Sequence, residues 1–451
     1  MEKIAKLFVS ALGVFGLAGG TVCDAAGPPE APVGVRASVD RPLLPKHSKD
    51  RRVVVKIEVE GAATKRANRT PLNLAIVLDR SGSMRGAKLE QAKQAAEMLV
   101  DQLDGDDVLS LVVYETEVEV LVPSAPLGNR GREIKNRIRR IESGGSTALH
   151  GGVEQGGRQL EEFLSRERIN RVILLSDGLA NVGPSSNREI AGLGRRLAEK
   201  GGSVTTIGLG DDYNETLMTT LAEAGDANYY YVADVESLPE VFERELGELK
   251  TIVARRLEIE IHCPRGVRPL RFLGRPGELK SQRESVVFGT LSGEQSRELY
   301  LECVLDEEGF GEISEIAEIA VSYDDASTAR RSEVGRFPVV VGYTDDVELA
   351  TSAEDKALQA EAAVFANAVE TEKAIRLADS GDIEGSRSQL ESQLSALARA
   401  HAAAPAAQKQ ILGEEIDAVK EAQEDLANNR MSKAQRKKLS RGSFELRNSK
   451  R

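Results

Sequence analysis

The stretch that most constrains the fold is a run of apolar residues, Leu72–Leu78, which is interrupted only by Asn73. Such a run beside a turn signal is typical of a β-strand buried on both faces of a sheet. Apolar residues then recur at helical spacing from Leu89 to Leu103. The hexapeptide DRSGSM at 79–84 lies between the two patterns, where a strand leads into a helix. In an open parallel sheet, this carboxyl edge is where ligands bind.

The hexapeptide places one carboxylate and two hydroxyls at alternate positions, Asp79, Ser81 and Ser83. In an extended or gently turned loop, alternate side chains fall on the same side. Three hard oxygen donors suit a small divalent cation, because Mg²⁺ prefers octahedral oxygen ligands at about 2.0–2.1 Å. A polar helix cap is the alternative interpretation, since Asp and Ser also favour N-caps and turns. The motif alone is compatible with both.

Two later stretches favour the metal site. The sequence GGSTAL at 144–149 places Thr147 at a predicted helix start, and RVILLSDG at 171–178 predicts a second buried strand that leads to Asp177. Together with D-x-S-x-S, these motifs resemble the von Willebrand factor type A domain over about a hundred residues. That resemblance implies a complete metal-ion-dependent adhesion site. Its five protein positions correspond to Asp79, Ser81, Ser83, Thr147 and Asp177.

The resemblance also implies what this site binds. The expected ion is Mg²⁺, with Mn²⁺ or Ca²⁺ as alternatives, and one position on it stays open for a carboxylate of a protein partner. The chain carries a net charge of −12, which argues against nucleic acid as a general partner.

The first 26 residues are typical of a secretory signal peptide. Lys3 and Lys6 precede an apolar, small-residue run from Leu7 to Gly20, and small residues follow it. We therefore expect export to a periplasmic or extracellular location, with cleavage near Ala26. Lipoprotein anchoring at Cys23 is the alternative, although the bulky Val22 before it disfavours that interpretation.

The patterning predicts several further regions. Residues 27–70 hold a linker and alternating strands, 71–250 alternate strands with helices, and 251–345 return to short alternating strands. The predicted fold is therefore α/β, with a doubly wound, mostly parallel, Rossmann-like sheet of the von Willebrand type inserted into a small β-sandwich. This organisation resembles bacterial exported proteins described as calcium-activated chloride channel-like, a name that by itself implies no channel.

Two cysteines fall at the ends of predicted strands in the β domain, Cys263 and Cys303. An exported chain permits a disulfide between them, and two small buried hydrophobic residues are the alternative.

The C-terminal part changes in composition. Residues 350–429 show helical spacing and short loops, which predict an α-helical hairpin or bundle. Residues 430–451 hold nine basic residues and one acid, which predicts a basic tail that binds the protein's own acidic body, an anionic envelope surface, or nothing. Of these, we expect a solvated tail without fixed structure.

Three functions follow as hypotheses. The first is a metal-dependent protein-binding or adhesion module that holds an acidic residue of its partner. The second is a structural envelope protein whose metal only stabilises the fold. The third, a hydrolase with Asp79 as nucleophile, is disfavoured because Ser81 replaces the second carboxylate of D-x-D and no G-x-S-x-G motif occurs. We therefore expect no enzymatic activity.

Overall fold

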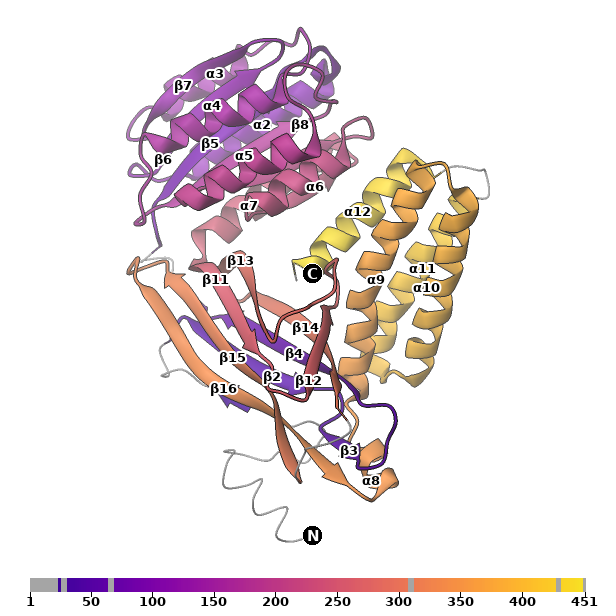
Figure 1. Cartoon of the computed structure of the whole chain (residues 1–451). Helices are drawn as coiled ribbons and strands as arrows, with labels where there is room; N and C mark the ends of the chain where they lie inside the picture. Colours follow the sequence, from indigo (N-terminus) through magenta and orange to yellow (C-terminus); the bar gives the residue numbers. More distant parts are fainter. Residues whose placement is uncertain (1–22, 26–30, 64–68, 307–311, 427–430, 449–451) are drawn as a thin grey trace.

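The structure is a computed structural model that describes residues 23–25, 31–63, 69–306, 312–426 and 431–448 of the 451-residue chain. Figure 1 shows an α/β domain above a β-sandwich, with a bundle of long helices beside the sandwich. The α/β domain carries the predicted site, and the other two parts determine what surrounds it.

The α/β domain is built on a six-stranded sheet in the order β10-β9-β8-β5-β6-β7. All neighbouring pairs are parallel except β6 with β7, which form an antiparallel hairpin at one edge of the sheet. The central strands are buried along their whole length, as expected when helices cover both faces. The strands are β5 (Leu72–Asp79), β6 (Val108–Tyr114), β7 (Val118–Pro126), β8 (Ile169–Ser176), β9 (Ser203–Leu209) and β10 (Tyr229–Val232).

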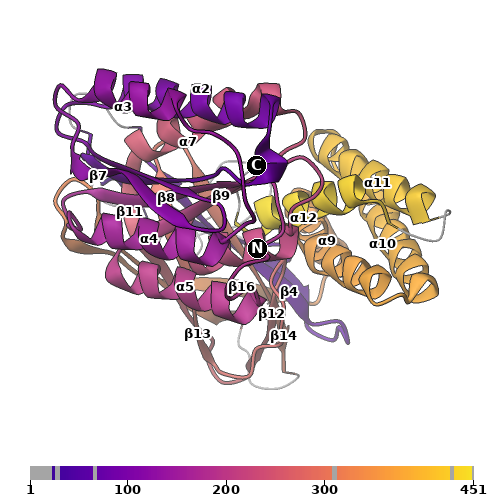
Figure 2. The same ribbon diagram turned by 90° about the horizontal axis from the view of Figure 1, so that it is seen from above.

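Helices cover the two faces of this sheet in two groups, as Figure 2 shows from above. One face packs on α2 (Ala87–Gln102), α3 (Gly131–Arg139) and α7 (Leu238–Lys250). The other packs on α4 (Leu149–Glu161), α5 (Asn187–Lys200) and α6 (Glu215–Ala224). This arrangement confirms the predicted doubly wound fold.

The β-sandwich consists of two five-stranded sheets, with strand orders β1-β2-β4-β14-β12 and β13-β11-β15-β16-β3. The chain leaves the sandwich after β4, forms the α/β domain and returns at β11, so the predicted insertion is present. The strands are β1 (Cys23–Ala25), β2 (Val33–Val39), β3 (Leu43–Pro45), β4 (Arg52–Gly61), β11 (Ile252–His262), β12 (Val267–Phe272), β13 (Arg283–Ser292), β14 (Ser296–Leu305), β15 (Ile313–Asp325) and β16 (Arg331–Thr344).

The two cysteines of the sandwich are buried free thiols, so the predicted disulfide is absent from the structure. Cys263 follows β11 in one sheet and Cys303 lies in β14 of the other. The two side chains are hydrogen-bonded to each other, and this contact lowers the pKa of Cys263 and raises that of Cys303. They behave as small residues of the sandwich core, which was the alternative interpretation.

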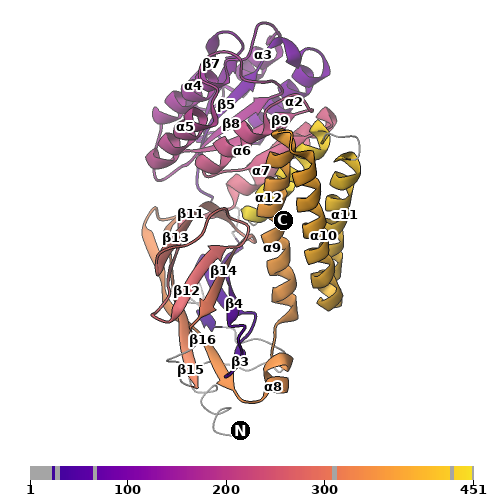
Figure 3. The same cartoon turned by 45° about the vertical axis from the view of Figure 1, so that its right-hand side comes forward.

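The C-terminal helical segment is also present as predicted. After the short α8 (Val347–Ser352), the bundle is formed by α9 (Lys356–Asp379), α10 (Ile383–Ala403) and α11 (Ala406–Leu426). The side chains of Asp355 and Asp382 cap the starts of α9 and α10 by accepting backbone N–H bonds. Figure 3 shows α9 running alongside the sandwich.

The prediction of a solvated basic tail is wrong. Residues Lys433–Arg447 form a further helix, α12, which lies between the α/β domain and α9 in Figure 1. Phe444 packs in the core of the α/β domain, whereas Leu439 and Leu446 pack in the core of the helical bundle. Because its buried residues face two different neighbours, the helix shows no single apolar stripe in the sequence.

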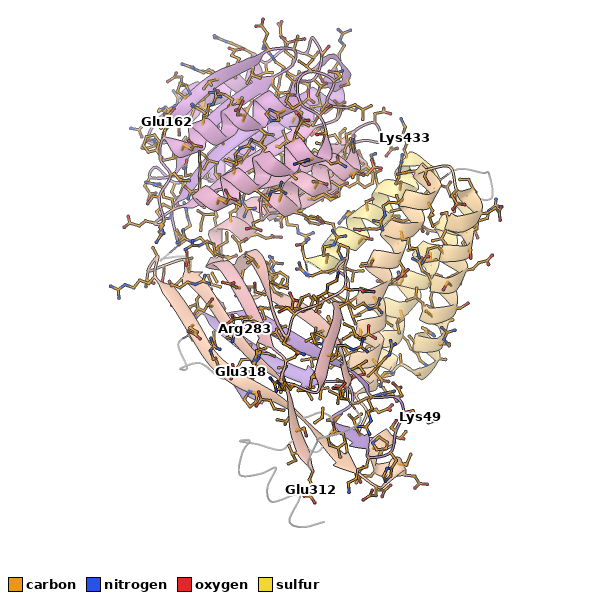
Figure 4. All side chains as sticks on the ribbon, in the orientation of Figure 1. Lys49, Glu162, Arg283, Glu312, Glu318 and Lys433 are labelled. Carbon is orange, nitrogen blue, oxygen red and sulfur yellow. The ribbon has the colours of Figure 1, made fainter. Side chains whose placement is uncertain are left out.

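The basic residues of α12 are neutralised within the molecule. Lys437 is 1% exposed, and its Nζ lies 2.9 Å from Glu215 Oε2 and 3.0 Å from the Tyr213 carbonyl oxygen. Lys433, labelled in Figure 4, pairs with Asp212 of the α/β domain. The other paired residues of α12 are Arg436, Lys438, Arg441 and Arg447. The basic segment therefore binds the protein's own body, which was one of the alternatives, and it does so through ion pairs to both the α/β domain and the helical bundle.

The predicted signal peptide and linker lie largely outside the described residues, apart from Cys23–Ala25, which pairs with β2. Within the described part of the chain, no helix combines the length and apolar character needed to span a bilayer.

Candidate metal centre

The first part of the site is the loop that follows β5. Asp79 is the last residue of this strand, and a single 3₁₀ turn, η2 (Gly82–Met84), follows before α2 begins. The Ser81 backbone N–H donates to Asp79 Oδ1 at 2.8 Å. The hydroxyls of Ser81 and Ser83 lie 3.1 Å apart. The turn thus gathers the three motif side chains on one side, as their alternate spacing predicted.

Asp177 belongs to the same edge of the sheet because β8 is the parallel neighbour of β5, with Leu78 opposite Leu175. Its carboxylate reaches across to the first loop, and Ser83 Oγ donates to Asp177 Oδ1 at 2.6 Å. The preceding residue, Ser176, donates from its hydroxyl to Asp79 Oδ2 at 2.7 Å. Each of the two strand ends therefore donates one hydrogen bond to an aspartate at the end of the other.

Thr147 is brought to the site by the loop before α4. Gly145 has a φ of +66°, and a Cβ there would collide with the Glu115 carboxylate, so the turn requires glycine. This loop is joined to the first by Gly82 N–H, which donates to the Gly145 carbonyl oxygen at 3.1 Å. A Cβ built on Gly178 would lie 3.2 Å from Thr147 Oγ1 and 3.3 Å from Ser83 Oγ. All five predicted residues therefore meet around one point.

The electrostatics of the site are dominated by buried negative charge. Asp79 and Asp177 are both 0% exposed. Burial raises the pKa of Asp79, and the nearby Asp177 raises it further, whereas hydrogen bonds from Ser81 and Ser176 lower it. Burial and Asp79 also raise the pKa of Tyr114, the last residue of the neighbouring strand β6. Among the described residues, none pairs a basic side chain with Asp79.

This arrangement fits a divalent cation. A buried carboxylate without a basic partner is costly, and a cation bound beside it would offset that cost. The two carboxylates and three hydroxyls are the hard oxygen donors that Mg²⁺ and Ca²⁺ prefer. Over the part of the chain that is described, no group of three or more His, Cys, Asp or Glu residues is arranged to hold a metal. A cation at this point would therefore have to use the hydroxyls of Ser81, Ser83 and Thr147 beside the two carboxylates.

Two functional residues were missed by reasoning from the sequence. Ser176 stood in the S-D-G motif, but its hydrogen bond to Asp79 depends on strand pairing. Lys88, in the first turn of α2, places its Nζ 2.5 Å from Asp177 Oδ2. Its position one helical turn after the motif was the only available signal, and a lysine there is equally typical of an exposed helix face.

The fold and the site define an α/β domain with a cluster of hydroxyls and carboxylates at the carboxyl edge of a parallel sheet. Residues 73–244 match the family model of the von Willebrand factor type A domain. The α/β domain is therefore a von Willebrand factor type A domain, and domains of this kind commonly mediate protein–protein interactions.

Similar proteins extend the comparison beyond this domain. The Synechocystis protein sll0103 is 28% identical over 287 residues, which cover 61% of this chain and 67% of that protein. YfbK of Escherichia coli K12 is 27% identical over 221 residues, which cover 49% of this chain but only 38% of YfbK. A solved structure, a von Willebrand factor type A protein from Catenulispora acidiphila, shares the fold with a TM-score of 0.68 at 16% identity, over 91% of this chain and 96% of that one.

The names of the relatives bear on enzymatic activity in different ways. YfbK and sll0103 carry no named activity. The WAV3 protein of Arabidopsis thaliana, 27% identical over 52% of this chain and 31% of its own length, is named an E3 ubiquitin-protein ligase. The relatives thus include a named enzyme, and a non-enzymatic role belongs to the proposal below.

Proposed function

We propose that this protein is a metal-dependent protein-binding or adhesion module, which holds a carboxylate of its partner through a divalent cation. One observation carries the proposal: Asp79, Ser81, Ser83, Thr147 and Asp177 come from three separate loops and meet at the carboxyl edge of one sheet. Mg²⁺ is the preferred ion, with Mn²⁺ and Ca²⁺ as alternatives.

The chain's own residues would divide the work in the following way. Asp79 and Asp177 supply two negative charges that balance a divalent ion. The hydroxyls of Ser81, Ser83 and Thr147 add donors without adding charge, so the ion would remain electrophilic toward an acidic ligand. When bound, the ion supplies a positive centre that accepts a further oxygen donor from outside the chain. The hydrogen bonds between the three loops hold the donor set in place before any ligand arrives.

The environment of Asp79 does not favour the hydrolase. Both of its oxygens accept hydrogen bonds, from Ser81 N–H and from the Ser176 hydroxyl. A carboxylate engaged in this way, at the bottom of a buried loop, is a poorer nucleophile than a free one. Metal-assisted binding therefore remains the function that the geometry supports best.

We also propose that the protein acts outside the cytoplasm, as the charged start and apolar run of residues 1–26 indicate. The resemblance to exported proteins with calcium-activated chloride channel-like organisation supports the same location. Intact-mass measurement of the mature chain tests this: a chain that starts near Ala26 is expected, and a lipid-modified Cys23 would establish anchoring instead.

The binding function is tested by a pull-down from envelope extract with the full chain in Mg²⁺ and in EDTA. The expected result is a partner that is retained only in Mg²⁺ and is lost with the Asp79→Ala variant. Partners retained equally in EDTA would show that the ion, if bound, only stabilises the fold. Thermal melts with and without Mg²⁺ show whether the ion binds at all. An ion at a hundredfold excess over its Kd stabilises the native state by about 2.7 kcal/mol, which raises the melting temperature.

A further inference from the structure

Lys88 is the one basic residue that touches the carboxylates of the candidate metal centre, within the described residues. Its Nζ lies 2.5 Å from Asp177 Oδ2, while the other oxygen of that carboxylate accepts from the Ser83 hydroxyl. Asp177 is fully buried, whereas the Lys88 side chain is 28% exposed. The ammonium group thus lies at the mouth of the site, between the buried carboxylate and solvent.

A second contact limits where this ammonium group can go. Gly210, at the end of β9, has a φ of +66°, and a Cβ built there would lie 3.8 Å from both Cε and Nζ of Lys88. Lys88 also contributes to the lowered pKa of Asp212 in the same loop, for which Lys433 is the main cause. Lys88 is therefore enclosed by the β9–α6 loop on one side and by Asp177 on the other, and its charge stays beside the site.

We propose that Lys88 sets the charge of the metal centre, so that the site binds its cation weakly and favours an anionic ligand. This inference rests on the proposed metal-binding function. Two carboxylates and a divalent ion would balance, and the ammonium group then leaves the centre with one net positive charge. A partner carboxylate would neutralise that charge, whereas an amide or hydroxyl would not.

The charge of Lys88 favours an anionic ligand but disfavours the metal ion itself. The ammonium group repels a cation at short range and competes with it for Asp177 Oδ2. Removing the charge should therefore strengthen metal binding and weaken carboxylate binding. A residue that only braced Asp177 would give the reverse result for the metal, because its loss would disorder a ligand.

The experiment compares Lys88→Met with Lys88→Arg in the full chain. Lys88→Met keeps an apolar stem without charge, and Lys88→Arg keeps the charge. Lys93→Met is the matched control, because Lys93 lies on the same helix but pairs with Glu90 at 2.9 Å instead of the site. Lys88→Gln serves as a second neutral variant if Lys88→Met folds poorly, and a thermal melt of each protein establishes folding.

Calorimetry with Mn²⁺ and with Mg²⁺ gives the first readout. The neutral variants should bind the ion about tenfold more tightly than wild type, whereas Lys88→Arg and Lys93→Met should stay within about threefold of it. Unchanged or weaker metal affinity in the neutral variants would overturn the inference. A wild type that binds neither ion would instead overturn the proposed function, and the inference with it.

Acetate binding to the Mn²⁺-loaded proteins, followed by water-proton relaxation, gives the second readout, with acetamide as the uncharged probe. The affinity for acetate should fall about tenfold in the neutral variants, whereas the affinity for acetamide should be the same in all the proteins. Equal acetate affinity in wild type and Lys88→Met would contradict the role in ligand selection.

Discussion

The substitution Phe444→Ala tests whether α12 is docked on the α/β domain. Phe444 is 2% exposed and contacts Tyr229 of the α/β domain edge to face, with ring centroids 5.6 Å apart. Truncating a buried phenylalanine to alanine costs about 3–5 kcal/mol, because apolar contacts are lost and a cavity remains. The substitution is therefore expected to weaken the attachment of α12 by this amount.

Native-state hydrogen exchange of the α12 amides measures this attachment directly. A loss of about 3 kcal/mol or more corresponds to exchange that is at least a hundredfold faster, since each 1.4 kcal/mol is about a factor of ten. The Lys438→Ala variant is the matched control on the same helix. Its ion pair with Glu421 is 57% and 51% exposed at the two side chains, and such surface pairs contribute about 1 kcal/mol or less.

Two exchange results would contradict the docking of α12. If Phe444→Ala and Lys438→Ala accelerate exchange to the same small extent, Phe444 does not anchor the helix in the α/β domain. If the α12 amides of the wild type exchange at the rate of an unstructured peptide, the sequence-based prediction of a solvated tail would be restored.

The remaining predictions concern the metal centre and one buried acid. Asp79→Asn removes a buried charge without a basic partner, so differential scanning calorimetry should show a higher melting temperature for the metal-free variant at pH 7 and no response to Mg²⁺. Thr147→Ala removes one donor and should weaken Mg²⁺ binding on the order of tenfold in calorimetry, whereas Ser146→Ala, at an exposed neighbour, should not. Burial raises the pKa of Asp40 from 3.8 to about 6, so wild type should lose stability as pH rises from about 4 through 6. Asp40→Asn should remove that loss, up to about 3 kcal/mol at neutral pH in urea titrations, and an unchanged pH profile would contradict the shift.

The sequence was most informative where local pattern and tertiary structure agree. The Leu72–Leu78 run could only be buried on both faces, and β5 is indeed the strand at the middle of the sheet beside β8. Parallel pairing brings the ends of two such strands together, so the sequence pattern alone predicts that Asp79 and Asp177 lie at one edge of the sheet. The alternating strands on either side of the α/β domain similarly predicted the insertion into a sandwich.

The sequence was least informative where burial depends on distant partners. Lys437 looks like part of a solvated basic tail, yet Glu215 and the Tyr213 carbonyl group, more than 200 positions earlier, enclose it. Nothing within α12 itself predicts those partners. Lys88 presents the same difficulty, because its contact with Asp177 exists only after β5, β8 and α2 have assembled.

The central claim is that one divalent cation binds among the five oxygen-bearing residues of the α/β domain. Anomalous diffraction from crystals of the full chain grown with Mn²⁺ tests it most directly. The account predicts a single strong anomalous peak within about 2.0–2.6 Å of oxygen atoms from this group. It also predicts that the peak disappears in Asp79→Ala crystals grown in the same way. A well-ordered site with no anomalous density, or a peak held only by residues elsewhere, would contradict it.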